Sequence, residues 1–148
     1  MRFNTERDYS TITMLFNKEL INTVIDNNVI LYKLHQQLSK TNSYGETTKK
    51  IWYTGEVIPA LVNRQVTNPT SDLMTYNVDQ QMEVAFLREE CRDRNVYPEN
   101  GDIIEYGNAL YEVHNVNENQ FYAGVANYNH TILCSTHLTN KNNLQLER

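Results

Sequence analysis

Histidine and cysteine side chains are the first candidates for chemistry in this sequence. His130, Cys134 and His137 offer three metal-type ligands within eight residues. On a β-strand, His130 and Cys134 share one face while His137 points to the other, so the three side chains do not converge. A structural zinc site also requires four ligands, at spacings such as C-x2-C or H-x3-H. The pattern therefore argues against a zinc site, and no metal or other cofactor is expected.

A nucleophile with its base is the second kind of site that these residue types could build. Cys134 could act with His114 or His137, because a thiol becomes a nucleophile when a histidine takes its proton. A lone Cys in a strand is more typical of a small core residue. The chain also has no Gly-rich phosphate loop and no G-x-S-x-G motif. We therefore expect no catalytic residue.

Acidic residues form two further groups. Glu89 and Glu90 are neighbours in a predicted helix, where adjacent side chains do not face each other. Their expected environment is a charged, solvated face that also carries arginines. A second group lies around one predicted hairpin and could hold a cation: Asp102, Glu105 and Glu112. Its spacing matches no calcium loop, so neither group predicts a site.

The balance of charge limits the partners of the chain. The net charge is -5, and the 13 Lys and Arg residues are scattered without a basic block. Because tight binding to duplex DNA requires Lys and Arg that displace counterions, the composition argues against direct nucleic-acid binding. No apolar run follows the first four residues, and no stretch approaches the ~20 apolar residues of a membrane span. The two cysteines fit a reducing cytoplasm.

Composition also indicates the general architecture. A chain of 148 residues fits one domain. Asn is the commonest residue and favours turns, while the 10 Tyr residues combine an apolar face with a polar tip and suit contact surfaces. Codon usage in an AT-rich genome would produce the same bias. We expect short elements joined by many turns.

The first half of the chain is predicted to be mostly extended. Residues 1–22 read as an N-terminal arm, in which Thr11–Met14 opens a short strand or a packed extension. A short apolar piece, residues 23–25, precedes a turn at 26–28. Strands are then predicted at Val29–His35, Lys50–Tyr53, Glu56–Val66 and Tyr76–Val84. The polar segment 36–50 is a long loop, and long loops in compact domains are usually functional or disordered.

The second half begins with the one predicted helix, Val84–Arg94. Val84, Leu87 and Cys91 recur at spacings of three and four, and Asn95 and Pro98 suit its exit. Turns are then predicted at 99–102, Gly107–Asn108 and Asn117–Asn119. The intervening strands are Ile103–Tyr106, Ala109–Val116, Gln120–Ala126 and Thr131–Thr136, and residues 139–148 form a flexible tail.

Together these elements predict a mainly β fold. It is a small antiparallel β-barrel or sandwich with one inserted α-helix at about residues 84–94 and extended arms. The expected organisation is an arm at 1–22, one domain at 23–138 and a tail at 139–148.

One stretch carries a resemblance to a known family. Pro98, Gly101, Asp102 and Ile103, followed by Tyr111 and Glu112, are similar to the "P-x-x-GD-x-I … x-[FY]-E-[IV]" pattern of tailed-bacteriophage neck proteins, the connector rings that close the portal after DNA packaging. The segment 116–124 resembles the next turn and strand of that family. Tyr44-Gly45-Glu46, followed by Lys49, is similar to another recurring piece. The likeness covers roughly residues 23–137, but the chain lacks the large C-terminal extension of the longer family members.

The resemblance implies a structural role without catalysis. It implies a homo-oligomeric ring, hexameric or dodecameric, in the virion neck between the portal and the tail, assembled in the host cytoplasm. Such a ring contacts the portal and neighbouring neck and tail proteins and helps retain or gate packaged DNA, which passes through the lumen without specific binding. No membrane is involved. The six motif residues would build the fold, and the candidate interface residues are Tyr44, Gly45, Glu46, Lys49 and Tyr97.

Two other classes of function stay open at this point. One is a small β-barrel protein-binding module without a virion role, which should be monomeric and show an aromatic-lined pocket. The other is a hydrolase that uses Cys134, His114 or His137.

Overall fold

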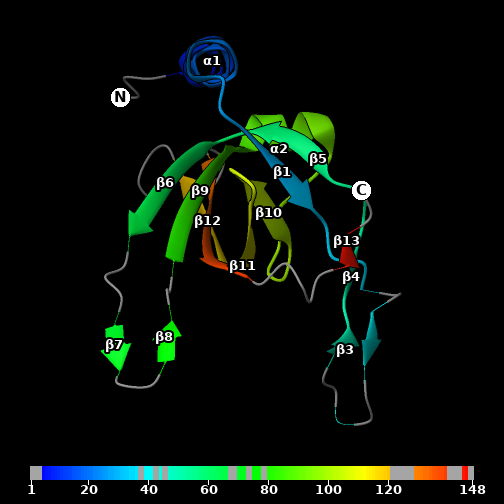
Figure 1. Ribbon diagram of the computed structural model, residues 1–148. Helices are drawn as coiled ribbons and strands as arrows, with labels where there is room; N and C mark the ends of the chain where they lie inside the picture. Colours follow the sequence, from blue (N-terminus) through cyan, green and yellow to red (C-terminus); the bar gives the residue numbers. More distant parts are fainter. Residues whose placement is uncertain are drawn as a thin grey trace.

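A seven-stranded antiparallel sheet forms the body of the computed structural model (Figure 1). The structure describes residues 5–36, 39–41, 44, 47–66, 70–72, 75–77, 80–120, 129–139 and 145–146, with backbone alone at 14, 40–41, 47–49, 65–66, 70–72, 75–77, 120 and 145–146. The strands follow the order β5-β1-β10-β11-β12-β9-β6 across the sheet. Their bounds are β1 Asn28–Tyr32, β5 Glu56–Pro59, β6 Leu61–Val66, β9 Gln80–Leu87, β10 Ile103–Tyr106, β11 Ala109–Gln120 and β12 Asn129–Leu138.

Alternating burial explains why these segments form strands. In β12, Ile132, Cys134 and Thr136 are buried while the residues between them are only partly covered. Cys134 lies opposite Val84 of β9, and side chains of the neighbouring strands complete one apolar core. Because successive residues of a strand point to opposite faces, such alternation places one face on the core. The predicted mainly β fold is confirmed.

The sheet curls because one segment supplies both of its edges. Strand β5 pairs with β1, and β6 pairs with β9 at the far side of the sheet. Only Ala60 separates β5 from β6; it is fully buried, and its N–H donates to the Asn27 carbonyl at 2.9 Å. No ladder joins β5 to β6 in the described part of the chain. The prediction of a single strand over 56–66 is therefore wrong, because the chain changes partners at Ala60.

Two small hairpins project from the same end of the body (Figure 1). In one, β2 (Lys40–Thr41) pairs with β3 (Thr47–Lys49); in the other, β7 (Thr70–Asp72) pairs with β8 (Thr75–Asn77). The first lies within the segment predicted as a long loop. The second shows that the predicted strand over 76–84 is wrong, since β8 and β9 belong to different sheets.

The end of the chain is also partly ordered by pairing. Strand β13 (Gln145–Leu146) runs parallel to β4 (Ile51–Trp52) and pairs with it. Most of the predicted tail, residues 139–148, lies outside the described residues. Strand β4 lies within the predicted strand Lys50–Tyr53, and an isolated bridge joins Leu34 to Trp52.

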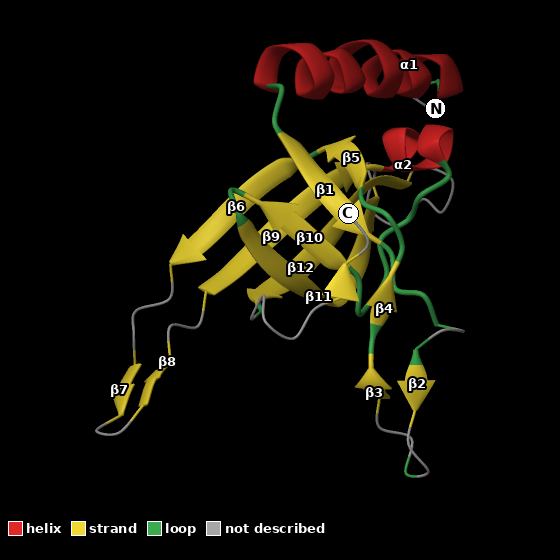
Figure 2. Ribbon diagram, turned by 45° about the vertical axis from the view of Figure 1, so that its right-hand side comes forward, coloured by secondary structure: helices red, strands yellow, loops and turns green. Residues whose placement is uncertain are grey.

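The N-terminal segment, predicted as an arm, is helical. Helix α1 (Glu6–Thr11) begins with a capping box between Thr5 and Asp8 and continues into two π-helical stretches, η1 (Ile12–Asn17) and η2 (Leu20–Ile25). It lies across one end of the sheet, beside the second helix (Figure 2). The predicted strand at Thr11–Met14 and the extended piece at 23–25 are therefore wrong. Winding with i→i+5 bonds is rare, and its wider turn does not produce the 3.6-residue period that marks an α-helix in a sequence.

The second helix, α2 (Arg88–Arg94), is shorter than predicted because its expected first turn belongs to β9. Val84, Leu87 and Cys91 are all buried, but the cross-strand partners of Val84 in β6 and β12 hold it in a strand. The predicted exit is confirmed: Asn95 adopts the left-handed conformation (φ 54°), which Asn tolerates better than most residues.

The hairpin β10–β11 is formed as predicted over its first half. Gly107 and Asn108 both have positive φ (57° and 64°), which is the type I′ geometry that joins two strands directly. Strand β11 then runs on to Gln120, paired with β12. The predicted turn at Asn117–Asn119 is wrong because this pairing keeps the segment extended. The strand predicted from Thr131 is part of β12, while most of the strand predicted at Gln120–Ala126 lies outside the described residues.

Replacing Gly55 by Ala should destabilise the fold. An added Cβ would lie 2.5 Å from Ile30 Cγ2 and 2.6 Å from the Tyr32 ring, and overpacking of this kind costs about 1–3 kcal/mol. Urea denaturation should show a lower free energy of unfolding for Gly55→Ala. The exposed neighbour Thr54 provides the control, since Thr54→Ala should change stability by less than about 0.5 kcal/mol. Equal stability of the two variants would contradict the close approach.

Candidate functional site

The buried carboxylate of Asp102 is the centre of the motif region. Its Oδ1 accepts the Leu34 N–H at 2.9 Å, and its Oδ2 accepts the Glu99 N–H and the Lys33 ammonium, each at 2.8 Å. Asp102 is 1% exposed. A carboxylate hidden from water needs such donors and a counter-charge to remain ionised. The side chain therefore joins the exit of β1, the loop after α2 and the start of β10.

Lys33 extends this network to the surface. Its ammonium also donates to the Tyr97 carbonyl at 2.7 Å and pairs with Glu99 at 3.2 Å. Burial raises the pKa of Asp102 above its usual value, while the hydrogen bonds from Lys33 and from the Leu34 and Glu99 backbone oppose the rise. The raised pKa reflects a carboxylate whose partners only partly replace the water it has lost.

Gly101 makes the tight turn that the sequence predicted. Its φ is 93°, a conformation open to glycine but strained for other residues. Its N–H donates to the Val113 carbonyl at 2.8 Å, and its own carbonyl accepts the Trp52 indole N–H at 3.1 Å. Trp52 is buried. Pro98, which opens the loop, is also buried.

The motif hairpin is buried on both faces. Ile104, Tyr111 and Val113 belong to the main core, whereas Ile103 and Leu110 join a second apolar cluster with Tyr32 and Trp52. These residues therefore belong to two separate apolar clusters. Glu112, the last motif residue, is partly exposed and pairs with Lys50 at 2.8 Å. The motif residues therefore either pack in the core or hold segments together through polar contacts.

A second buried carboxylate ties the N-terminal helix to α2. Glu90 accepts from Arg94 at 2.8 Å and from Asn22 at 3.5 Å, and it lies 3.4 Å from the Lys18 ammonium. Lys18 also pairs with Asp93. Burial acts to raise the pKa of Glu90, but the bonds from Arg94 and Asn22 and the Lys18 charge outweigh it, so the pKa lies below its usual value. This contribution to stability is present above the unfolded pKa and is lost as the pH falls through the folded pKa.

The cysteines have the environment of core residues. Cys91 and Cys134 are fully buried, and burial raises the pKa of each thiol to about 12. The thiolate that a nucleophile requires is then scarce at neutral pH. His114 and His137 lie ring to ring, 5.6 Å apart, and His130 instead contacts Asn17 of the N-terminal helix at 2.6 Å. Among the described residues no three His, Cys, Asp or Glu side chains are arranged to hold a metal ion.

The acidic residues considered as sites each have a separate partner. Glu105 accepts the Tyr32 hydroxyl at 2.7 Å, while Asp102 binds Lys33 and Glu112 binds Lys50. The three carboxylates around the hairpin are therefore engaged separately. Glu89 pairs with Arg92 and Glu90 with Arg94, so this adjacent pair also divides between different partners.

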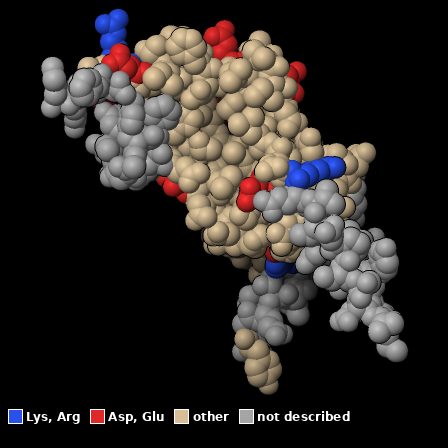
Figure 3. Space-filling view, turned by 90° about the vertical axis from the view of Figure 1, so that its left-hand side faces the viewer, with Lys and Arg blue, Asp and Glu red and all other residues tan. Residues whose placement is uncertain are grey.

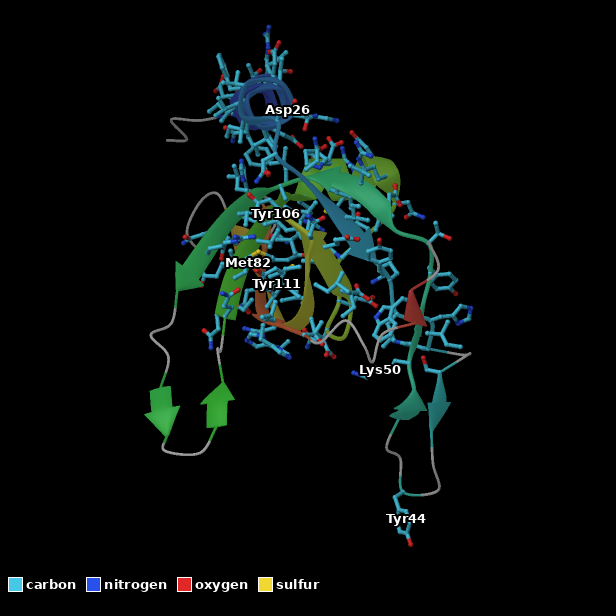
Figure 4. All side chains as sticks on the ribbon, in the orientation of Figure 1. Asp26, Tyr44, Lys50, Met82, Tyr106 and Tyr111 are labelled. Carbon is cyan, nitrogen blue, oxygen red and sulfur yellow. The ribbon has the colours of Figure 1, made fainter. Side chains whose placement is uncertain are left out.

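The predicted interface residues fall on separate surfaces. Tyr44 is 91% exposed and lies at the far end of the β2–β3 hairpin (Figure 4). Lys49 is in β3, opposite Lys40, whereas Gly45 and Glu46 lie outside the described residues. Tyr97 is 37% exposed and borders a polar hollow beside Tyr9, Arg88 and Arg92. The structure does not bring Tyr97 together with Tyr44.

One hollow was not predicted from the sequence. It lies between the N-terminal helix and strands β6, β9 and β12, and its lining is mainly aliphatic: Asn17, Leu20, Ile21, Ile25, Leu61, Ala85, Leu87, His130 and Thr131. Three of its apolar lining residues, Leu20, Ile21 and Ile25, come from the N-terminal helix, which the sequence did not predict.

Comparison with known proteins gives no further assignment. No protein-family model matches the chain, and no curated protein matches it either. Within the described residues, none of the helices has the length and apolarity needed to cross a bilayer. On the described surface of the face shown in Figure 3, Lys and Arg do not gather into one patch.

Replacing Lys33 by Met should destabilise the protein by about 3 kcal/mol at neutral pH, because it leaves the buried Asp102 carboxylate without its counter-charge. Loss of the ammonium raises the folded-state pKa of Asp102 further above its already raised value. Protonation of the Asp102 carboxyl stabilises the folded state, and this stabilisation is lost as the pH rises through the folded-state pKa. The difference between Lys33→Met and wild type in urea denaturation should therefore grow from about pH 4 toward neutrality.

Lys50→Met provides the matched control. Lys50 pairs with Glu112 at the same 2.8 Å distance, but both side chains are more exposed than Asp102, and such pairs contribute about 0–1 kcal/mol. A loss for Lys33→Met that equals that of Lys50→Met, or that does not vary with pH, would contradict the anchoring role of Asp102.

Proposed function

We propose that this protein is a structural, non-enzymatic subunit of a tailed bacteriophage, one copy in a ring of the neck that joins the portal to the tail. The proposal comes from the resemblance of the Pro98–Asp102 motif and the following hairpin to phage neck proteins. In this fold those residues make the Asp102 hydrogen bonds and pack in the core, which agrees with a structural role for the motif.

The projecting β2–β3 hairpin is the observation that carries an assembly role. Its described strands stand away from the sheet, and Tyr44 near their far end is 91% exposed (Figures 1 and 4). Tyr is among the residues enriched at protein interfaces, so the hairpin suits contact with a neighbouring subunit or ring.

A ring requires each copy to present two different surfaces to its neighbours. Such heterologous contacts close into a ring when the rotation from one copy to the next divides a full circle evenly. The resemblance implies six or twelve copies. The net charge of -5 suits a lumen through which DNA slides without specific binding. The portal and the adjoining neck and tail proteins are the expected partners, and the virion neck is the expected location.

One hollow favours the alternative, a small protein-binding module without a virion role. The rings of Tyr53 and His35 stack at 4.2 Å, and both line a hollow together with Leu34, Gln36 and Glu99. A binding module of this kind should use Tyr53, whereas a ring subunit should use the hairpin of Tyr44. The two functions therefore depend on different side chains.

Immunogold labelling of purified virions, viewed by electron microscopy, tests the location. Label confined to the vertex between head and tail would support the neck assignment. Label over the capsid or along the tail would contradict the neck assignment but leave a virion role. Virions without label would remove the virion role and support the binding module.

Tyr44→Ala should reduce ring formation by about tenfold or more, as truncation of an aromatic interface residue does, when assembly is counted by electron microscopy of the purified protein. Tyr53→Ala is the matched control, because Tyr53 is 49% exposed and lies outside the hairpin. Rings that form equally well with Tyr44→Ala would contradict the role of the hairpin.

A further inference from the structure

The N-terminal helix exposes apolar side chains along most of its length. Five large ones are 42–72% exposed and are called the helix stripe here: Leu15, Phe16, Leu20, Val24 and Ile25. In an α-helix of 3.6 residues per turn they would spread around most of the circumference. In the wider i→i+5 winding that η1 and η2 adopt, they fall within a narrower part of it. The π-helical stretches thus gather the helix stripe on one side.

The other side of the helix is fastened to the body by polar contacts. The Tyr9 hydroxyl donates to the Asn129 carbonyl at 2.9 Å, and the Asn17 amide lies 2.6 Å from the His130 ring nitrogen. Lys18 pairs with Asp93 of α2. These contacts are spread along the helix, so its rotation is fixed and the helix stripe is held outward.

Charge is nearly absent from this part of the helix. Between Ser10 and Ile25 the only charged residues are Lys18 and Glu19, and Lys18 is turned toward α2. A helix face in contact with water usually carries many charged residues, whereas the centre of a protein interface is depleted of them. The composition of the helix stripe is therefore that of a buried contact.

We propose that the helix stripe binds the helix stripe of a second copy of this chain, with the two helices antiparallel about a two-fold axis at Leu20. The stripe complements itself in that arrangement: Phe16 of each copy lies opposite the smaller Val24, and Leu15 lies opposite Ile25. Large side chains facing smaller ones interdigitate, and antiparallel helices also align their dipoles favourably.

The charged residues of the first helical turn do not oppose this pairing. In this register Asp26, just after the end of one helix, lies opposite a position of the partner that is six residues along the chain from Asp8. The acidic first turn, Glu6 and Asp8, therefore extends past the end of the partner helix. The like charges at the two helix ends are thereby kept apart.

An aliphatic hollow lies at the edge of the helix stripe, between the helix and the sheet. Leu20 and Ile25 belong both to the helix stripe and to the lining of the hollow, whose opposite wall includes Leu61, itself 39% exposed.

The area is sufficient for a specific contact. The helix stripe presents on the order of 500 Å² of apolar surface, comparable with the largest patches of monomeric proteins. A pair would bury on the order of 1,000 Å² in total, at the lower end of specific interfaces. The expected affinity is therefore micromolar.

This pairing is independent of the proposed neck function. A two-fold contact cannot close a ring of identically oriented copies, so the helix pair forms between free chains or between two rings that meet face to face. Its failure would leave the neck assignment intact, and labelling of virions tests that assignment separately.

Cross-linking with Leu20→Cys tests the two-fold geometry. The native cysteines are both buried, so mild oxidation with diamide should join two chains only through the introduced thiol and give a disulfide-linked dimer on a non-reducing gel. Val57→Cys is the matched control, since Val57 is 51% exposed on β5 and should remain monomeric. No dimer from Leu20→Cys, or equal dimer from both variants, would overturn the proposal.

Sedimentation equilibrium tests the role of Phe16 in the full-length chain. Wild type should form a dimer at micromolar concentration, and Phe16→Ser should weaken association by about tenfold or more, while Val57→Ser should associate as wild type does. Circular dichroism checks that each variant stays folded. A monomeric wild type, or Phe16→Ser that dimerises like wild type, would mean that the helix stripe does not bind a second copy.

Discussion

A carboxylate removed from water must be surrounded by donors, and Asp102 draws them from three segments. The Lys33 ammonium and the Leu34 and Glu99 N–H groups all converge on it. This single side chain thereby fixes the exit of β1, the loop after α2 and the start of β10. Any shift of one segment would leave a buried charge without a partner, so the rest of the arrangement depends on this contact.

The hairpin after Asp102 packs into two apolar clusters. Ile103 and Ile104 are adjacent in sequence, yet one packs with Trp52 and the other with the main core. A strand can do this only when both faces are covered. The body of the protein is thus completed within one chain, and the parts that project from it, such as the β2–β3 hairpin, have surface to offer to other molecules.

The N-terminal helix reverses the usual distribution of polar and apolar residues. Polar residues such as Asn17 and Lys18 contact the body, while apolar side chains such as Phe16 face outward. In water this arrangement is unfavourable for an isolated monomer. The proposed pairing of two copies would cover these side chains.

The sequence by itself determined the features that depend on neighbouring residues: the Gly107–Asn108 turn, the helix exit at Asn95, the tight turn at Gly101 and the mainly β fold. The adjacent placement of Gly101 and Asp102 also marked the motif region, but not the partner Lys33, which is 69 residues from Asp102. Tertiary structure decided the break at Ala60 and the assignment of Val84 to a strand, because distant strands supply the hydrogen bonds. It also decided which side of the N-terminal helix is exposed, since contacts with the body fix its rotation.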